Sequence, residues 1–240
     1  FINDFCIKGV YKIKFSWNII MHITIKNLLK ISEDVKQKLP IDDITYKSPK
    51  IIAVSKTFKI DHIKPLIEHG HLDFGENKVQ EAIEKWSEIK KVKKDLKLHL
   101  IGRLQTNKVK TAIQIFDYIH SVDSKKLADR ISKYQNQLNV KTKLFIQVNV
   151  GNEDQKSGIS KSNVIELYNY CKKIELDVVG LMCIPPFGED TEKYFKEMKN
   201  LKDEIGLSEL SMGMSSDYIN AAENGSTYLR IGSNIFGKRG

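Results

Sequence analysis

A lysine at the end of a buried strand is the first residue whose type and place point to chemistry. Residues 51–55, IIAVS, form an apolar run typical of a strand buried on both faces, and Lys56 follows directly. Burying an ammonium group costs free energy, so Lys56 either extends its flexible stem to solvent or occupies a sheltered pocket. In a sheltered pocket we expect a lowered pKa and a neutral amine able to condense with an aldehyde. The residues alone leave both interpretations open.

Two segments near the C-terminus combine glycine with hydroxyl side chains: Gly213-Met214-Ser215-Ser216 and Gly232-Ser233. Glycine lets the backbone approach an anion closely, and serine can donate a hydrogen bond or cap a helix. Helix capping by Ser215 or Ser216 explains the first segment about equally well. The pairing of the two segments favours a phosphate site.

Eight short apolar runs alternate with amphipathic segments, and each run predicts a strand. They are residues 51–55, 72–76, 98–102, 118–123, 144–150, 178–184, 210–214 and 227–232. A further helical stripe over 25–39, closed by Pro40, precedes them. Strands separated by single helices must pair in parallel, which predicts an α/β fold, a single (β/α)8 TIM-type barrel with an extra N-terminal helix. A doubly wound open sheet is the alternative.

In such a barrel the functional groups come from the C-terminal ends of the strands and the loops after them. The loops after strands seven and eight often bind phosphate, and strand eight lies beside strand one, which carries Lys56. A phosphate held on one side and an amine on the other would suit a phosphorylated aldehyde. Arg230 ends strand eight and is always cationic, so beside a pyridine nitrogen it would disfavour protonation of the ring.

Composition excludes several classes of protein. The 240 residues are 41% hydrophobic and 29% charged, and no apolar stretch approaches the length of a membrane span. The net charge of +9 could favour nucleic acid, but no recognition motif or aromatic-interleaved basic patch accompanies it. Cys6, Cys171 and Cys183 are widely spaced, which indicates a reducing cytoplasm. His69 and His71 lack further ligands at metal-binding spacing, so we expect no metal site.

Residues 1–20 differ in character from the rest of the chain. They begin without Met and show no helical period, whereas Met21 opens an amphipathic segment. We therefore expect 1–20 to be a non-core N-terminal extension, read from upstream of the true translation start, and 21–240 to form one barrel domain.

Several motifs, taken together and in order, resemble one family. They are AVSKTF, FGENKVQEA, HLIGRLQTNK, IHSVDS, VNVGNEDQKSGI, GLMCIPP and LSMGMSSDY…GSTYLRIGSNIFG. Over about residues 25–238 the chain resembles the pyridoxal phosphate homeostasis proteins, single-domain relatives of the alanine racemase N-terminal barrel. The resemblance implies a cytoplasmic protein that holds pyridoxal 5'-phosphate (PLP) as a lysine aldimine and takes part in its intracellular homeostasis and delivery.

The resemblance also implies roles for particular residues. Lys56 would form the aldimine, Arg230 would face the pyridine nitrogen, and Asn77 and Met214 would lie near the cofactor ring. The phosphate would be held by a further set: Ser215, Gly232 and Ser233. Arg103 receives no role.

Function beyond cofactor binding stays open at this point. Alanine racemases add a second domain with a catalytic tyrosine, and this sequence ends directly after the barrel, so we expect no robust catalysis. Tyr218, expected on a helix, and Tyr228, expected within a strand, are poor substitutes. The alternatives are a PLP-dependent racemase or other Schiff-base enzyme, which would exchange amino-acid α-protons rapidly, and a nucleic-acid binder with salt-sensitive affinity. We expect a monomer whose partners are PLP and PLP-dependent apoenzymes.

Overall fold

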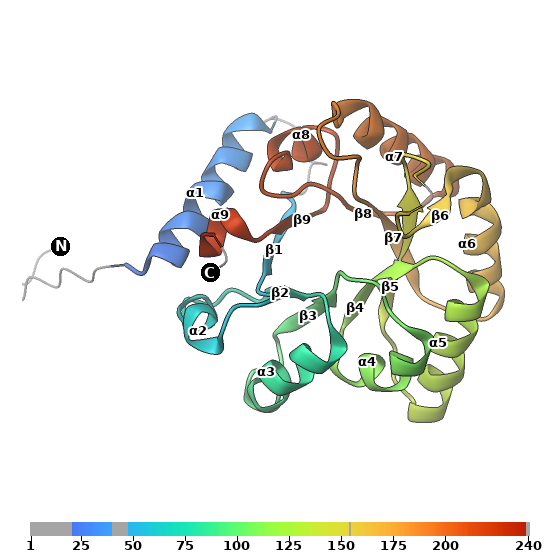
Figure 1. Ribbon diagram of the computed structural model, residues 1–240, viewed down its shortest axis with the longest axis horizontal. Helices are drawn as coiled ribbons and strands as arrows, with labels where there is room; N and C mark the ends of the chain where they lie inside the picture. The colour runs from blue at the N-terminus through green and yellow to red at the C-terminus, as the bar shows by residue number, and fades with distance from the viewer. Residues whose placement is uncertain (1–20, 40–47, 154, 239–240) are drawn as a thin grey trace, which may run out of the picture.

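Eight parallel strands close into a barrel in the computed structural model, which describes residues 21–39, 48–153 and 155–238. Helices surround the barrel (Figure 1). The strands are β1 Lys50–Val54, β2 Asp73–Glu76, β3 Lys97–Leu100, β4 Tyr118–Val122, β5 Lys143–Asn149, β6 Ile159–Ser160, β7 Val178–Cys183, β8 Glu209–Ser211 and β9 Tyr228–Ile231. The helices are α1 Ile23–Lys38, α2 Ile60–Glu68, α3 Val79–Val92, α4 Val109–Ile115, α5 Lys125–Leu138, α6 Val164–Lys173, α7 Glu192–Ile205, α8 Tyr218–Glu223 and α9 Ser233–Phe236, with 3₁₀ turns at Thr106–Lys108 and Lys161–Asn163.

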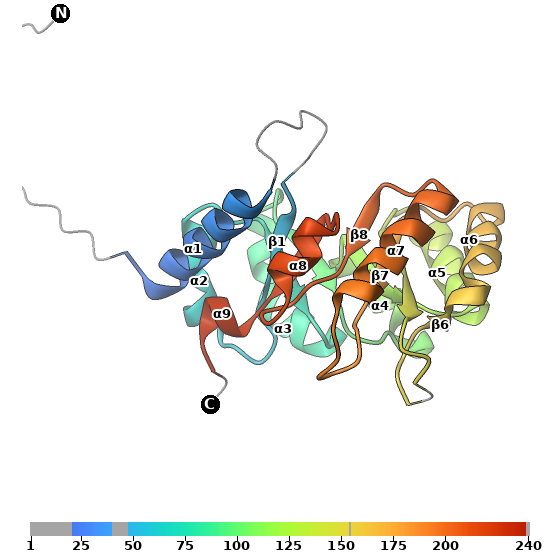
Figure 2. The same ribbon diagram turned by 90° about the horizontal axis from the view of Figure 1, so that it is seen from above.

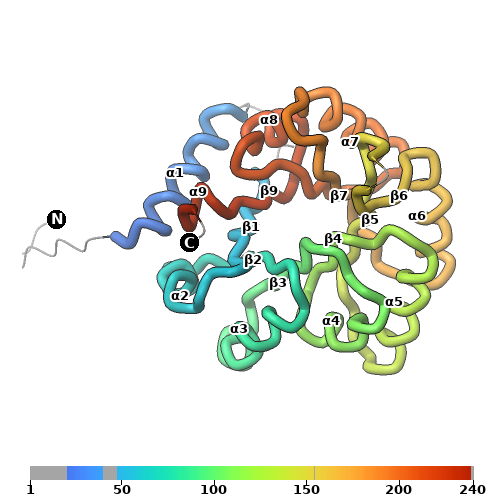
Figure 3. Tube along the Cα trace, in the orientation of Figure 1, coloured from blue at the N-terminus to red at the C-terminus, as the bar shows by residue number. Residues whose placement is uncertain are grey.

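Closure of the sheet confirms the predicted (β/α)8 barrel. The strand order is β4-β3-β2-β1-β9-β8-β7-β5, and β4 also pairs with β5, so the ring has no free edge and the open-sheet alternative is wrong. The first and last strands lie side by side, with Ile52 opposite Arg230 (Figure 3). The short β6 was not predicted. It pairs with β5 outside the ring and contains no apolar run.

The predicted N-terminal helix is present as α1, which ends at Lys38; Pro40 lies outside the described residues. Its buried stripe includes Leu28, Ile31 and Val35. This helix lies beside α9, the last helix of the chain, as two perpendicular views show (Figures 1 and 2). A hydrogen bond from Asn27 Nδ2 to the main-chain oxygen of Ile235 joins them. The two ends of the described chain therefore stabilise each other.

Alternate residues of each strand face opposite sides of the barrel wall, as the two-residue period of a strand requires. One side packs against the helices in a large apolar core; Ala53 and Leu229 belong to it. The opposite residues fill the barrel interior. They form a second buried cluster: Ile52, Tyr118, Phe145, Met182 and Tyr228. The interior is thus packed by side chains from five strands, and open space is left at one end.

Helix boundaries follow from local chemistry. Helix α5 begins where the Ser124 hydroxyl accepts a hydrogen bond from the Leu127 amide, and it ends at Asn139, whose φ of 50° is left-handed. Helix α7 ends at Gly206 with φ 78°, a conformation that glycine adopts without strain. At both of these helix ends, a left-handed residue stops the helix and lets the chain turn toward the next strand. In the described residues, no helix is long and apolar enough to cross a membrane.

Candidate functional site

The seven residues that the sequence singled out lie around one cavity of about 560 Å³. They are Lys56, Asn77, Met214, Ser215, Arg230, Gly232 and Ser233. The cavity lies at the C-terminal ends of the strands, where a barrel of this kind places its reactive groups. Ser216, from the first of the two paired segments, also lines it, and further lining comes from residues to which the sequence had given no role: Val54, Ile101, Ile184, Gly237 and Lys238.

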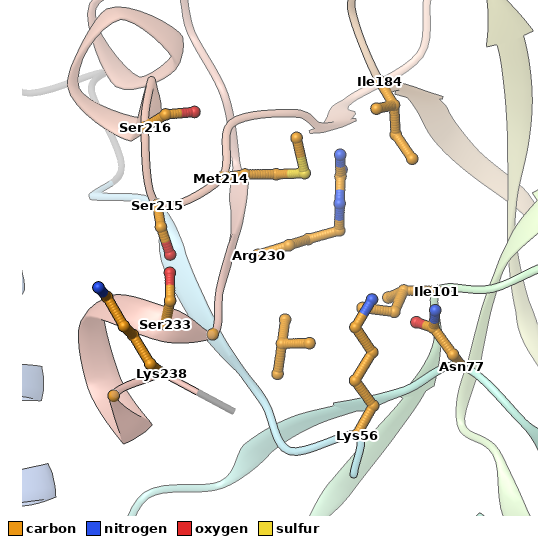
Figure 4. Close-up of a pocket in the computed structure, with 13 residues that line it drawn as sticks. Lys56, Asn77, Ile101, Ile184, Met214, Ser215, Ser216, Arg230, Ser233 and Lys238 are labelled. Carbon is orange, nitrogen blue, oxygen red and sulfur yellow. The ribbon is translucent and has the colours of Figure 1, made fainter. Parts of the chain in front are cut away.

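The polar groups divide between two sides of the cavity (Figure 4). The Ser215 and Ser233 hydroxyls face each other on one side, and the amine of Lys56 lies on the other beside the Asn77 amide. Arg230 and Met214 lie between the two sides. A ligand with an anionic group at one end and an amine-reactive group at the other would match this arrangement.

A buried ion pair holds the main chain immediately before Lys56. Glu76, at the end of β2, is fully buried, and its Oε1 accepts hydrogen bonds from Ser55 Oγ at 2.7 Å and Trp86 Nε1 at 3.0 Å. Lys85 Nζ lies 2.9 Å from the same oxygen and also donates to the main-chain oxygen of Ser55 at 2.9 Å. Ser55 is therefore bound through both its side chain and its carbonyl.

The main chain after Lys56 is held from the same helix, α3. The Thr57 amide donates to Glu81 Oε1 at 2.5 Å, and Lys85 Nζ donates to that oxygen at 3.0 Å. Thr57 has φ 69°, which is costly for a β-branched residue, so these contacts hold a strained turn. Lys56 is half-buried and projects from this fixed turn into the cavity.

Asn77 is held by close backbone packing. A Cβ on Gly102 would lie 2.4 Å from the Asn77 carbonyl oxygen, so the two loops approach at a distance that only glycine permits. The half-buried Asn77 faces the cavity beside Lys56.

The serine-rich loop after β8 is built by Asp217 and Asn234. Asp217 Oδ1 accepts from the Met214 amide at 2.6 Å, and Asp217 is also the residue that precedes α8. The predicted alternative, that Ser215 or Ser216 caps this helix, is therefore wrong. Instead, Asn234 makes two hydrogen bonds to Ser215. The main-chain N–H of Asn234 donates to Ser215 Oγ at 3.4 Å, and its side-chain Nδ2 donates to the Ser215 carbonyl at 2.9 Å. This joins the two segments that the sequence paired.

Arg230 is only 4% exposed and is anchored on the inner wall of the barrel. Its Nη1 donates to Ser211 Oγ at 2.8 Å and its Nη2 to the Cys183 carbonyl at 2.7 Å. Burial lowers the pKa of the guanidinium, which remains cationic near neutral pH because its ordinary pKa lies far above that range. A guanidinium has five N–H donors, so groups beyond these two bonds can face the cavity.

Two features of the site escaped sequence reasoning. His120 belongs to the run 118–123 that predicted the fourth strand but received no role, and in β4 it is fully buried in the barrel interior. Ser211, which contacts both His120 and Arg230, was overlooked. The available signal was a hydroxyl side chain within the apolar run 210–214 that predicted the seventh strand.

A second cavity of about 360 Å³ adjoins the first and shares Asn77, Ile101 and Ile184 with it. Arg103, to which no role was assigned, lines this second cavity.

Other candidate groups lie away from the site. His69 directly follows α2, and the described residues contain no group of three or more His, Cys, Asp or Glu side chains that could hold a metal. Tyr218 begins α8 and donates to Asp34, and Tyr228 lies in β9. Cys171 and Cys183 are buried, and burial raises the pKa of each thiol to about 12. Cys6 lies outside the described residues.

The fold and the cavity define a barrel protein of the alanine racemase N-terminal type, and the family model "Alanine racemase, N-terminal domain" matches residues 41–240. The pyridoxal phosphate homeostasis protein of Aquifex aeolicus is 41% identical over 200 residues, which cover 79% of this chain and 87% of that protein. A human protein of the same name is 37% identical over 218 residues, 82% of this chain and 79% of that protein. The chain belongs to the family of pyridoxal phosphate homeostasis proteins.

Solved structures agree with this assignment. PipY of Synechococcus elongatus without PLP has a TM-score of 0.80 and 34% identity, covering 90% of this chain and all of that one. The PLP-bound form of PipY has a TM-score of 0.77. An alanine racemase of Clostridium difficile has a TM-score of 0.68 at 17% identity and shares the fold; the match covers 90% of this chain and 56% of that one.

Proposed function

We propose that this protein binds pyridoxal 5'-phosphate in the 560 Å³ cavity, with the aldehyde attached to Lys56, and takes part in intracellular PLP homeostasis and delivery. One observation carries the proposal: an amine and a pair of hydroxyls lie on opposite sides of a cavity that a cationic arginine also lines (Figure 4). The PLP-bound structure of the related PipY supports it.

The donor set fits the cofactor group by group. The hydroxyls of Ser215 and Ser233, with the backbone at Gly232, would hold the phosphate. Lys56 Nζ would condense with the aldehyde, with loss of one water, and when bound the cofactor supplies an electrophilic carbon and a pyridine ring. Arg230 would face the pyridine nitrogen and, as a cation, keep it unprotonated. Met214 and Asn77 would contact the ring and its substituents.

The residues that line the cavity favour binding of the cofactor without catalysis. Among the described residues that line it, the ionisable groups are Lys56, Arg230 and Lys238, and none is Asp, Glu, His, Tyr or Cys. Tyr218 and Tyr228, the tyrosines weighed as acid/base groups, do not line it. We infer that the protein carries PLP to apoenzymes in the cytoplasm, as a monomer, and releases it by exchange with an amine.

Absorption spectroscopy tests the proposal. Purified protein titrated with PLP should develop the visible band of a lysine-bound cofactor, and borohydride should fix the cofactor on the peptide that contains Lys56. Lys56→Ala should lose the band. Lys238→Ala is the matched control, because Lys238 is the other lysine lining the cavity, and this variant should keep the band. A colourless wild-type protein, or an equal band in Lys56→Ala, would overturn the proposal.

A further inference from the structure

A line of polar side chains crosses the barrel interior from its far end to the cavity. Asp73 Oδ1, at the start of β2, lies 3.0 Å from His99 Nε2 on β3, and His99 Nδ1 lies 3.0 Å from His120 Nε2 on β4. His120 Nδ1 lies 2.8 Å from Ser211 Oγ on β8, and Ser211 Oγ accepts from Arg230 Nη1 at 2.8 Å. Four hydrogen bonds thus connect five strands.

The three middle members are sealed from water. His99, His120 and Ser211 have no exposed surface, whereas the side chain of Asp73 is 17% exposed at the end of the barrel opposite the cavity. Aromatic rings fix both imidazole planes. His99 stacks on Tyr118 at a centroid distance of 4.4 Å, and His120 stacks on Phe145 at 4.2 Å. Neither imidazole can turn away to find another partner without opening the interior.

Charge determines which members are ionised. Burial lowers the pKa of His99, and burial, with further lowering by the neighbouring His99 and the cationic Arg230, lowers the pKa of His120 well below its ordinary value. Burial alone would raise the pKa of Asp73, but the hydrogen bond with His99 and the charge of Lys50 contribute to lowering it overall. Near pH 7, both imidazoles are therefore neutral and the Asp73 side chain is a carboxylate.

A carboxylate at one end allows only one arrangement of protons. Asp73 can only accept, so His99 carries its proton on Nε2 and accepts at Nδ1. His120 must then donate from Nε2 and accept at Nδ1, because a neutral imidazole has one donor and one acceptor. Ser211 must donate its single proton to His120, which turns its lone pairs toward Arg230. Every bond donates in the same direction, from Arg230 to Asp73.

We propose that Asp73 is a positioning residue for Arg230: its carboxylate, at the far end of the barrel, sets the direction of this chain and so holds an acceptor under the guanidinium. The part of the proposal that concerns PLP rests on the proposed function. Without an acceptor-only group at position 73, both histidines gain their second tautomer and the Ser211 hydroxyl is no longer fixed. Ser211 Oγ has two lone pairs and can still accept from Arg230, but its orientation is no longer set, so the Cys183 carbonyl is left as the partner of Arg230 with a fixed geometry.

Nitrogen-15 NMR of the histidines in cofactor-free protein tests the chain directly. In the wild type, His99 and His120 should both carry the proton on Nε2. Asp73→Glu keeps an acceptor-only carboxylate and should keep both tautomers, whereas Asp73→Leu should give mixed tautomers at both positions. His99→Phe keeps a ring for stacking on Tyr118 and should free the His120 tautomer, so it replaces Asp73→Leu if that variant does not fold.

PLP titration tests the consequence for Arg230. Asp73→Leu and His99→Phe should bind PLP about three- to tenfold more weakly, the range of one ordinary hydrogen bond, and with a shifted absorption maximum. Asp73→Glu should match the wild type. Unchanged tautomers in Asp73→Leu, or wild-type affinity and spectrum in both chain-breaking variants, would overturn the inference. Failure of the wild type to bind PLP would instead overturn the proposed function, since the tautomers are measured without the cofactor.

Discussion

Glu76 positions Lys56 although its own side chain faces away from the cavity. It lies on the outer side of the barrel wall, between β2 and α3, and its Oε1 receives three hydrogen-bond donors. Its Oε2 is buried and has no hydrogen-bond partner among the described residues. A carboxylate with one unsatisfied oxygen is costly to bury, so its negative charge has to be balanced locally. Lys85 supplies that balance and at the same time fixes the carbonyl of Ser55.

Glu76→Gln should destabilise the protein by about 3 kcal/mol, at the low end for breaking a buried ion pair, because Lys85 keeps Glu81 as a partner. The turn that carries Lys56 should also loosen, so attachment of PLP to Lys56 should become slower. Urea unfolding measures the first effect and the rate of rise of the visible band measures the second.

Glu84→Gln is the control for this prediction, because Glu84 is exposed on the same helix. It should change stability by no more than about 0.5 kcal/mol. Equal effects of the two substitutions would show that the buried pair has no special role in holding the turn.

Apolar runs in the sequence predicted the strands of the barrel, because each strand has one side buried under the helices and the other side buried in the barrel interior. The run 51–55 and the run 227–232 correspond to β1 and β9 within a residue or two at each end. The two-residue β6 has no such run and could not be found. The seven site residues lie at or just after strand ends, and the family resemblance singled them out among such positions, but neither indicated the partners of Arg230. Ser211 and the Cys183 carbonyl belong to β8 and β7, the two strands that follow β9 in the sheet order, and only the pairing of these strands brings them together.

Gly180→Ala tests the contact between β7 and β8. A Cβ at this position would lie 2.1 Å from the Glu209 carbonyl oxygen, a main-chain atom that cannot move without shifting the strand. We expect a loss of about 3 kcal/mol in the free energy of unfolding, measured by urea denaturation. Gly188→Ala is the comparison. It has nothing within 4 Å but a φ of 79°, so backbone strain alone should cost about 1 kcal/mol. A smaller loss for Gly180→Ala than for Gly188→Ala would contradict the packing explanation.

For the whole molecule, the neutral histidines inside the barrel make stability depend on pH. Burial lowers the pKa of His99 and of His120, so the unfolded chain binds more protons than the folded protein just below the ordinary histidine pKa of about 6.5. Their contribution is therefore complete above about pH 6.5 and is lost as the pH falls. The pKa of Asp73 is also lowered, but its contribution is lost only below its ordinary value of about 3.9.

Thermal or urea unfolding between pH 7.5 and 5.0 should show this loss, with each buried histidine adding a slope of up to about 1.4 kcal/mol per pH unit. His99→Phe should give a shallower slope, because one titrating group is removed. A pH-independent free energy of unfolding over this range would contradict the assignment of neutral, buried imidazoles.

Pairing of β1 with β9 also has a consequence for biosynthesis. Lys56 leaves the ribosome long before Arg230 and Ser233, and the ring closes only when β9 docks between β1 and β8. A nascent chain therefore displays the Lys56 amine before it has any means of anchoring a phosphate. Stable loading with cofactor must wait until β9 has been made, so each new copy draws on the free vitamin pool only once its barrel has closed.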